Sequence, residues 1–224
     1  MNLFGVPRYL EAYPGCDFCD FNLIRVVVCP CCFFASNDIN EFDRISTGSK
    51  EKSASFGASA ISKQWLEKKD ERKNLVADCL PHFFDEERSL KQAILAYQLA
   101  IISSDEIFKI DEGRRPRLRN YNSARKSTYF LFVKAELLMR NSEVNEAENT
   151  LKEVIRRLEF IFPMLTNEFS IRSAYLLGLL NVYFGEYRQA GKYLIFLNEY
   201  NKNDSIQNRD DFSKATLTGF DGPY

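Results

Sequence analysis

The sequence has little of what membrane proteins, secreted proteins and most nucleic-acid binders require. Its 224 residues carry 30 basic and 31 acidic side chains, for a net charge of −1. This balance gives no overall field that would attract nucleic acid or an anionic membrane. The apolar runs are far shorter than the roughly 20 residues of a membrane-spanning helix. Arg8 and Glu11 also interrupt the N-terminal apolar residues before a secretory signal forms. We therefore expect a cytoplasmic protein that does not bind membranes.

Catalytic motifs are scarce as well. The sequence lacks a Gly-rich phosphate loop, an HExxH motif and a GxSxG motif. His82 is the only histidine, and a lone histidine among apolar residues is more often packed or exposed than catalytic. A nucleophilic Cys79 would need His82 as its base, and the proline between them makes the geometry of that dyad unpredictable. We predict that the protein is not an enzyme.

Cysteine is the informative residue type. Two CxxC pairs lie near the N-terminus, one formed by Cys16 and Cys19 and the other by Cys29 and Cys32. Four thiolates from two such pairs bind one tetrahedral zinc ion in many structural sites. The apolar, β-branched residues 21–28 (FNLIRVVV) predict a strand between the pairs. The sequence therefore predicts a small N-terminal Cys-rich β knuckle that holds a structural zinc.

Other roles for these thiols stay open. Phe33 stands where a knuckle often has glycine, and Cys31 is an extra thiol that competes for the same role. Without metal, the cysteines would form a disulfide, which a reducing cytoplasm disfavours, or would simply be buried, as we expect for Cys79. In a third hypothesis the clustered thiols sense oxidants and release the metal on oxidation.

Composition divides the chain into four parts. Residues 1–45 form the Cys-rich unit. Residues 46–85 contain a linker rich in Ser, Gly and Lys and a short charged helix, which we expect to pack Trp65 inward. Residues 86–200 form a helical domain, and residues 201–224 form a polar tail. The length suits one sizeable domain with a small appendage.

Helical periodicity dominates from residue 86 onward. In the first helix, apolar residues recur at three- and four-residue steps over residues 90–101. Four further helices follow in two hairpins, at residues 127–140, 144–162, 170–184 and 187–200. We expect the aromatic side chains of these helices to pack in the core, namely Tyr97, Phe130, Phe132, Tyr175, Tyr183 and Tyr193.

The two hairpins are similar to each other. Ala135 and Ala147 lie 12 positions apart, as do Gly178 and Ala190, and the two pairs are offset by 43 positions. Small residues at such positions let paired helices approach closely in tetratricopeptide-like repeats, although Ser142 replaces the usual turn glycine. The sequence predicts a mainly α fold of tetratricopeptide-like helical hairpins that bind another protein.

A basic segment between two of these helices indicates a different function. Its cations are interleaved with Tyr121 and Asn122, an arrangement that neutralises phosphates while an aromatic ring stacks on a base. Zinc knuckles also occur in nucleic-acid-binding proteins. The alternative is a solvated loop that leads into a helix. The cations concerned are Arg114, Arg115, Arg117, Arg119, Arg125 and Lys126.

Several motifs, taken in order, resemble those of one known family. They are DFC at 17–19, VVVCPCCFFA at 26–35, KQAILAYQLA at 91–100, YLLG at 175–178 and GEY at 185–187. Over most of the chain this order resembles the uncharacterised bacterial domain-of-unknown-function 2225 family. The resemblance implies an N-terminal zinc-ribbon-like unit joined to tetratricopeptide-like helices, and it implies no particular activity.

The resemblance also implies metal ligands. Cys19 matches the cysteine of the family's DFC element, Cys29 and Cys32 match its CPxC pair, and Cys16 has no clear counterpart. The chain lacks the further upstream CPxC pair with which members usually begin, and Phe33 and the phenylalanine after it replace the family's Gly-Tyr. Either Cys16 supplies the fourth ligand or the site has become a hydrophobic cap.

Overall fold

The structure is a computed structural model. It describes residues 6, 11–12, 14–15, 17–42, 65–85, 87–114, 121–165 and 168–207, with the backbone alone for 110–114 and 202–207. The chain divides into two compact units, Met1–Pro163 and Met164–Tyr224, which are described separately. The described residues are mainly helical with a small N-terminal sheet, which confirms the predicted fold class. No helix among them is long and apolar enough to cross a membrane.

The first unit contains a short helix and a two-stranded sheet. Helix α1 (Phe21–Ile24) precedes β1 (Val27–Val28), which pairs antiparallel with β2 (Ala35–Ser36). The strand predicted over residues 21–28 is therefore wrong in its first half. Asp20 explains the difference, because its Oδ1 accepts a hydrogen bond from the Asn22 amide at 3.0 Å. This bond caps a helix where the apolar residues favoured a strand.

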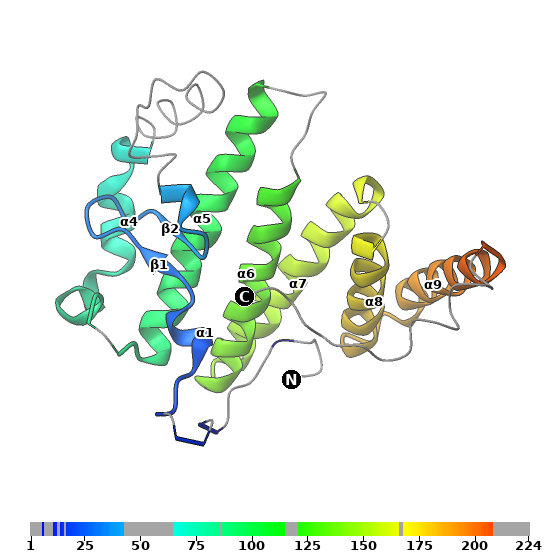
Figure 1. Cartoon of the computed structure of the whole chain (residues 1–224), viewed down its shortest axis with the longest axis horizontal. Helices are drawn as coiled ribbons and strands as arrows, with labels where there is room; N and C mark the ends of the chain where they lie inside the picture. Colours follow the sequence, from blue (N-terminus) through cyan, green and yellow to red (C-terminus); the bar gives the residue numbers. More distant parts are fainter. Residues whose placement is uncertain are drawn as a thin grey trace. The chain divides into compact units, whose positions relative to one another are not determined.

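The sheet packs against the long helix α5 (Leu90–Arg114) (Figure 1). The Ala35 amide donates a buried hydrogen bond to Ser103 Oγ of α5, at 3.0 Å. Two further elements lie between the sheet and α5 in the sequence. They are α4 (Lys69–Leu75) and the 3-10 helix η1 (Ala77–His82). Trp65, just before α4, is 3% exposed, which confirms that it packs inward.

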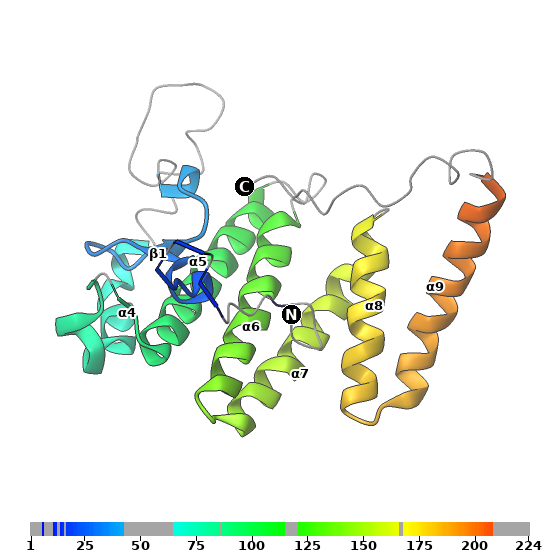
Figure 2. The same cartoon turned by 60° about the horizontal axis from the view of Figure 1, so that its bottom comes forward.

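Helices α5, α6 (Asn122–Arg140) and α7 (Val144–Ile161) pack side by side in the first unit (Figure 2). Their shared core contains the buried side chains of Tyr97, Phe130 and Phe132, as the sequence predicted. The ring centroids of Tyr97 and Phe130 lie 5.9 Å apart in an edge-on arrangement. Such contacts fix the packing of α5 on α6.

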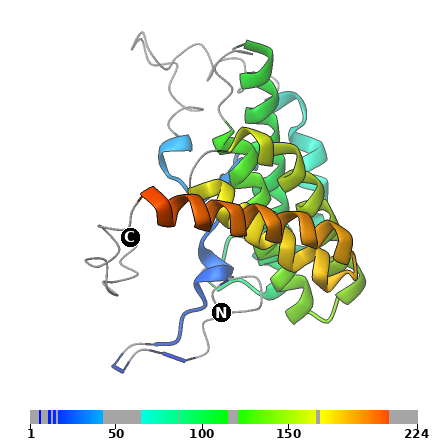
Figure 3. The ribbon, with the colours of Figure 1, turned by 90° about the vertical axis from the view of Figure 1, so that its right-hand side faces the viewer.

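The second unit is a hairpin of α8 (Glu168–Tyr183) and α9 (Tyr187–Gln207), which lie alongside each other (Figure 3). The 3-10 helix η2 (Phe162–Met164) spans the boundary between the units. The expected core positions of Tyr175 and Tyr183 are wrong, because these side chains are 57% and 42% exposed, and Tyr193 is half-buried. Helix α8 is apolar almost all round, so periodicity alone does not show which face is buried.

The two hairpins end their first helices in the same way. Ser142 has a φ of +63° and Gly185 a φ of +77°, and these two residues are 43 positions apart. In each turn the next residue's amide donates to the carbonyl five positions back, at 2.9 Å after Ser142 and 2.8 Å after Gly185. This is the hydrogen-bond pattern of a Schellman ending. Ser142 therefore adopts the left-handed conformation that the turn glycine adopts in the other hairpin.

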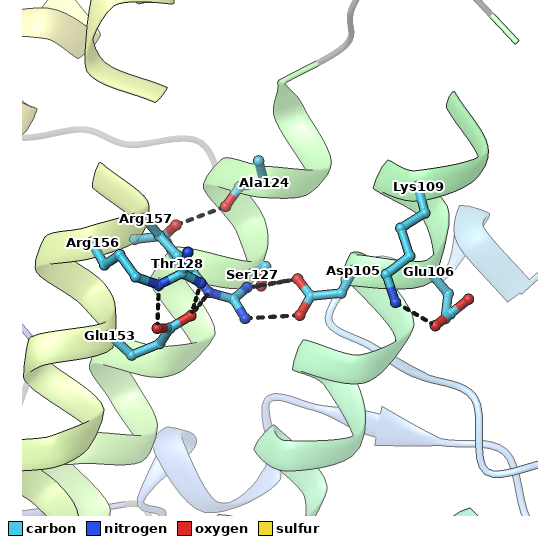
Figure 4. Close-up of polar contacts among 9 residues, drawn as sticks. All are labelled: Asp105, Glu106, Lys109, Ala124, Ser127, Thr128, Glu153, Arg156 and Arg157. Atoms are coloured by element: carbon cyan, nitrogen blue, oxygen red, sulfur yellow. Dashed lines mark hydrogen bonds and ion pairs between the residues drawn. The ribbon is translucent and has the colours of Figure 1, made fainter. Parts of the chain in front are cut away.

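An ionic network joins α5, α6 and α7 (Figure 4). Arg157 of α7 donates to both carboxylate oxygens of Asp105 of α5, at 2.6 and 2.9 Å, and to Glu153 at 2.7 Å. Ser127 of α6 donates to Asp105 at 2.6 Å. Arg156 binds Glu153 through two nitrogens, at 2.7 and 2.6 Å. The hydrogen bond from Arg156, opposed by partial burial and assisted by Arg157, lowers the pKa of Glu153 to about 2.

The lowered pKa of Glu153 makes stability depend on pH. A carboxylate with a lower pKa in the folded chain contributes stability above its ordinary pKa, here 4.5, and loses that contribution as the pH falls toward 2. We expect the free energy of unfolding to fall less steeply over this range in Glu153→Gln than in wild type. Urea titrations at several pH values measure the slope. Parallel wild-type and Glu153→Gln curves would contradict the prediction.

Two glycines of the second unit should respond oppositely to alanine. A Cβ on Gly178 would lie 3.9 Å from that of Tyr193, an ordinary contact, so Gly178→Ala should gain up to about 1 kcal/mol of helix propensity. Gly185→Ala forces a left-handed alanine and should cost about 1–2 kcal/mol. Equilibrium unfolding of the full chain, monitored by circular dichroism, compares the two variants. Equal shifts of the same sign would refute the backbone explanation.

Candidate metal centre

The second CxxC pair lies in a tight turn between β1 and β2. The Phe33 amide donates to the Cys29 carbonyl at 2.9 Å, and the Cys29 amide donates to the Phe34 carbonyl at 2.8 Å. Phe33 has a φ of +58°, in the left-handed region that normally favours glycine. Its side chain is buried, and its ring centroid lies 6.3 Å from that of Phe84. Phe33 therefore keeps a glycine-type turn, and burial of its ring offsets the backbone cost.

The two thiols of this turn have unequal acidity. Burial raises the pKa of Cys29, but hydrogen bonds from the backbone amides of Cys32 and Cys31 and from their thiols outweigh it, so the pKa is lowered. Burial raises the pKa of Cys32 and the neighbouring Cys29 adds to this effect, and together they outweigh the hydrogen bond from the Phe34 amide and the charge of the Arg72 guanidinium. Cys29 is therefore the more acidic of the two thiols, and Cys32 the less acidic.

The carbonyl of Cys32 anchors the turn to the segment around α4. It accepts hydrogen bonds from Trp65 Nε1 at 2.9 Å and from Arg72 Nε at 3.1 Å. The Arg72 guanidinium lies 3.6 Å from the centroid of the Trp65 ring and also donates to the Trp65 carbonyl. Burial lowers the pKa of Arg72. The ring of Phe34 meets that of Trp65 edge-on, with centroids 5.6 Å apart. This packing holds the backbone of the cysteine pair against the segment around α4.

The structure gathers only part of the predicted ligand set. Cys29 is half-buried and Cys32 buried, whereas Cys19 and Cys31 are exposed and Cys79 is half-buried. Cys16 lies outside the described residues. Within the part of the chain that is described, no group of three or more Cys, His, Asp or Glu side chains is arranged to hold a metal ion. The four-thiolate site therefore stays a prediction.

The Cys29 turn nevertheless fits half of a tetrahedral thiolate site. Zinc binds thiolates, and amide hydrogen bonds to the sulfur atoms stabilise that charged form. Cys29 and Cys32 receive such bonds from the amides of Cys32, Cys31 and Phe34. A structural zinc needs two more ligands, which the sequence assigns to Cys16 and Cys19.

The basic segment is only partly described. Arg115, Arg117 and Arg119 lie outside the described residues, as does the side chain of Arg114. Arg125 donates a long hydrogen bond from its Nη1 to Asn122 Oδ1, at 3.5 Å.

Lys126 has a structural role. It is 19% exposed, and its Nζ lies 3.0 Å from Glu41 Oε2 and 3.0 Å from Ser36 Oγ. Ser36 in turn donates to the same Glu41 oxygen at 2.5 Å. Lys126 therefore ties α6 to the end of the sheet.

The residues that sequence reasoning missed are the anchors of the turn. Trp65 and Arg72 contact Cys32 from 33 and 40 residues further along the chain. Their spacing of seven residues, two helical turns, was the available signal that both side chains share a face. It did not indicate which backbone group they bind.

These features define a class of protein with a cysteine-bearing turn docked on a long helix, followed by helical hairpins. The chain belongs to the family described as an uncharacterized protein conserved in bacteria (DUF2225), whose model matches residues 19–214. The match includes Cys19, Cys29 and Cys32 and begins after Cys16. No curated protein and no solved structure is similar to the chain at the level required for a match.

Trp65→Phe tests the anchoring of the turn. The substitution keeps an aromatic ring but removes the hydrogen bond to the Cys32 carbonyl, so we expect a loss of about 1 kcal/mol in unfolding free energy. The buried Cys32 thiol should also react faster with a thiol reagent. Urea unfolding and timed thiol labelling measure the two effects. Leu66→Ala, at an exposed neighbouring position, is the control, and equal labelling rates in all three proteins would argue against the anchor.

Proposed function

We propose that this protein is a non-enzymatic interaction protein of the bacterial cytoplasm. Its N-terminal Cys-rich unit holds a structural zinc through thiolates, and its helical hairpins, which we take to be tetratricopeptide-like, bind another protein. The observation that carries partner binding is the exposed apolar surface of the second unit. Tyr175 and Val182 of α8 are 57% and 47% exposed, and Leu194 and Ile195 of α9 are 57% and 61% exposed. Large apolar side chains with this degree of exposure are typical of protein-binding sites.

The zinc component rests on the Cys29 turn. Cys29 and Cys32 would supply two thiolates, and Cys16 and Cys19 the other two. A bound zinc ion would supply positive charge that keeps all four sulfurs deprotonated and would cross-link the two CxxC pairs. The left-handed turn at Phe33 and the amide hydrogen bonds to Cys29 support this assignment.

Metal content tests the zinc component. Protein purified without added zinc should contain about one zinc per chain by elemental analysis, because one tetrahedral site uses all four thiolates. Cys29→Ser and Cys32→Ser should each lose the metal, whereas Cys31→Ser and Cys79→Ser should keep it. A wild-type chain without metal and with six titratable thiols, or a loss of zinc in Cys31→Ser alone, would overturn the assignment.

Partner binding is tested on α9. The double change Leu194→Glu and Ile195→Glu places two charges in the exposed apolar surface and should abolish the partner's cross-links, while the melting temperature stays near that of wild type. In-cell cross-linking with mass spectrometry identifies the partners. Asn198→Glu adds a charge at an exposed polar position of the same helix and should leave them unchanged. Cross-links that survive the double change would place binding elsewhere.

Nucleic-acid binding is the weaker alternative. Lys126 is only 19% exposed and is held by Glu41 and Ser36, so its ammonium group is largely covered within the chain. A salt-dependent shift of RNA or DNA by the purified protein would favour that alternative.

A further inference from the structure

A cavity of about 300 Å³ lies in the first unit, between α5, α6 and α7. Phe108 of α5, Ala124 of α6 and Phe160 and Ile161 of α7 form its apolar walls. Phe160 is 50% exposed, so part of this aromatic wall is accessible from solvent. We call this cavity the α5–α7 pocket.

The pocket also has a polar lining whose charges are paired with each other. Asp105 and Arg157 both line it, and they neutralise each other through two hydrogen bonds (Figure 4). Asp105 also accepts from Ser127, at 2.6 Å. Because the carboxylate of Asp105 is fully engaged, it adds little repulsion toward an anion at the opening. The same bonds hold three helices in register, so the pocket exists before any ligand arrives.

Two cations at the pocket keep hydrogen-bonding capacity. Lys109 is 65% exposed and donates once, to Glu106 at 2.9 Å. Arg156 is 71% exposed and donates twice, to Glu153. An ammonium group has three N–H donors and a guanidinium five, so both side chains have donors left for a further carboxylate.

The size of the pocket limits what it accepts. Pockets for small molecules span roughly 300–1,000 Å³, and this one, at about 300 Å³, lies at the lower limit. That volume suits one large side chain better than a cofactor. Protein interfaces are anchored in this way, by an aromatic or aliphatic side chain that fills a pocket within a polar rim.

We propose that the α5–α7 pocket binds a partner protein through a segment with one aromatic or large aliphatic residue flanked by acidic residues. The apolar side chain packs between Phe108, Phe160 and Ile161, and the flanking carboxylates accept hydrogen bonds from Lys109 and Arg156. This inference rests on the proposed partner-binding function and adds a second contact site and the chemistry that it recognises.

The test uses the full chain and short fluorescent peptides. The probe carries a central Trp flanked by Glu, and two matched peptides replace either the Trp by Ala or each Glu by Lys. We expect anisotropy titrations to show binding of the probe at least roughly tenfold tighter than of either control, with an affinity that falls as salt rises. Arg156→Gln and Phe160→Ser should each weaken the probe by roughly tenfold or more. Lys91→Gln, at an exposed position near the other end of α5, should bind like wild type.

Three results would overturn the proposal: absence of probe binding to wild type, equal binding of the Trp and Ala peptides, or equal weakening by Lys91→Gln and Arg156→Gln. Melting curves of the variants separate loss of the pocket from loss of the fold. Cellular partners that are kept by Arg156→Gln and Phe160→Ser but lost on charge insertion at Leu194 and Ile195 would reject the pocket while preserving the proposed function. Absence of any cross-linked partner in the wild-type protein would reject the proposed function itself.

Discussion

The hydrogen bond from the Ala35 amide to Ser103 is the interaction through which the cysteine-bearing turn depends on the helices. A sheet of two strands with two residues each has too little internal pairing to persist in water by itself. Docking on α5 supplies the missing burial, since Val28 and Ala35 are covered in this arrangement. The thiols are therefore presented by the helical core, although composition indicated a small unit joined by a linker. The bounds of the four predicted parts remain a prediction.

Helix α5 contacts both the sheet and helix α7. Ser103 holds the sheet, and two positions later Asp105 binds Arg157 of α7. Since both contacts come from one rigid helix, movement of the cysteine turn relative to the α5–α7 pocket requires α5 itself to shift or bend. The ion pair has low exposure and several hydrogen bonds, which gives it more geometric specificity than an isolated surface pair.

The sequence was sufficient for elements whose pattern is local. The period of α6 and α7, and the turn at Ser142, were readable because each depends on neighbours within one or two helical turns. The first half of the predicted strand was wrong because a single side chain, Asp20, caps α1. The contacts of Trp65 and Arg72 with Cys32 link distant segments, and no local period encodes the partner of such a side chain. For the same reason the gathering of Asp105 and Arg157 at one pocket was not predictable.

The left-handed Phe33 has a consequence for how a metal ion would meet this chain. A glycine at this position would adopt the left-handed conformation without strain, but it would also leave the unfolded chain more conformational freedom. Phenylalanine is strained in this conformation, so the turn depends on burial of its ring. Burial of this ring in the protein interior thus helps to order the loop. The half of a metal site that Cys29 and Cys32 supply would then be shaped before an ion binds, in contrast to zinc fingers, whose polypeptide condenses around the ion. Removal of the ion would leave the backbone of this loop in place.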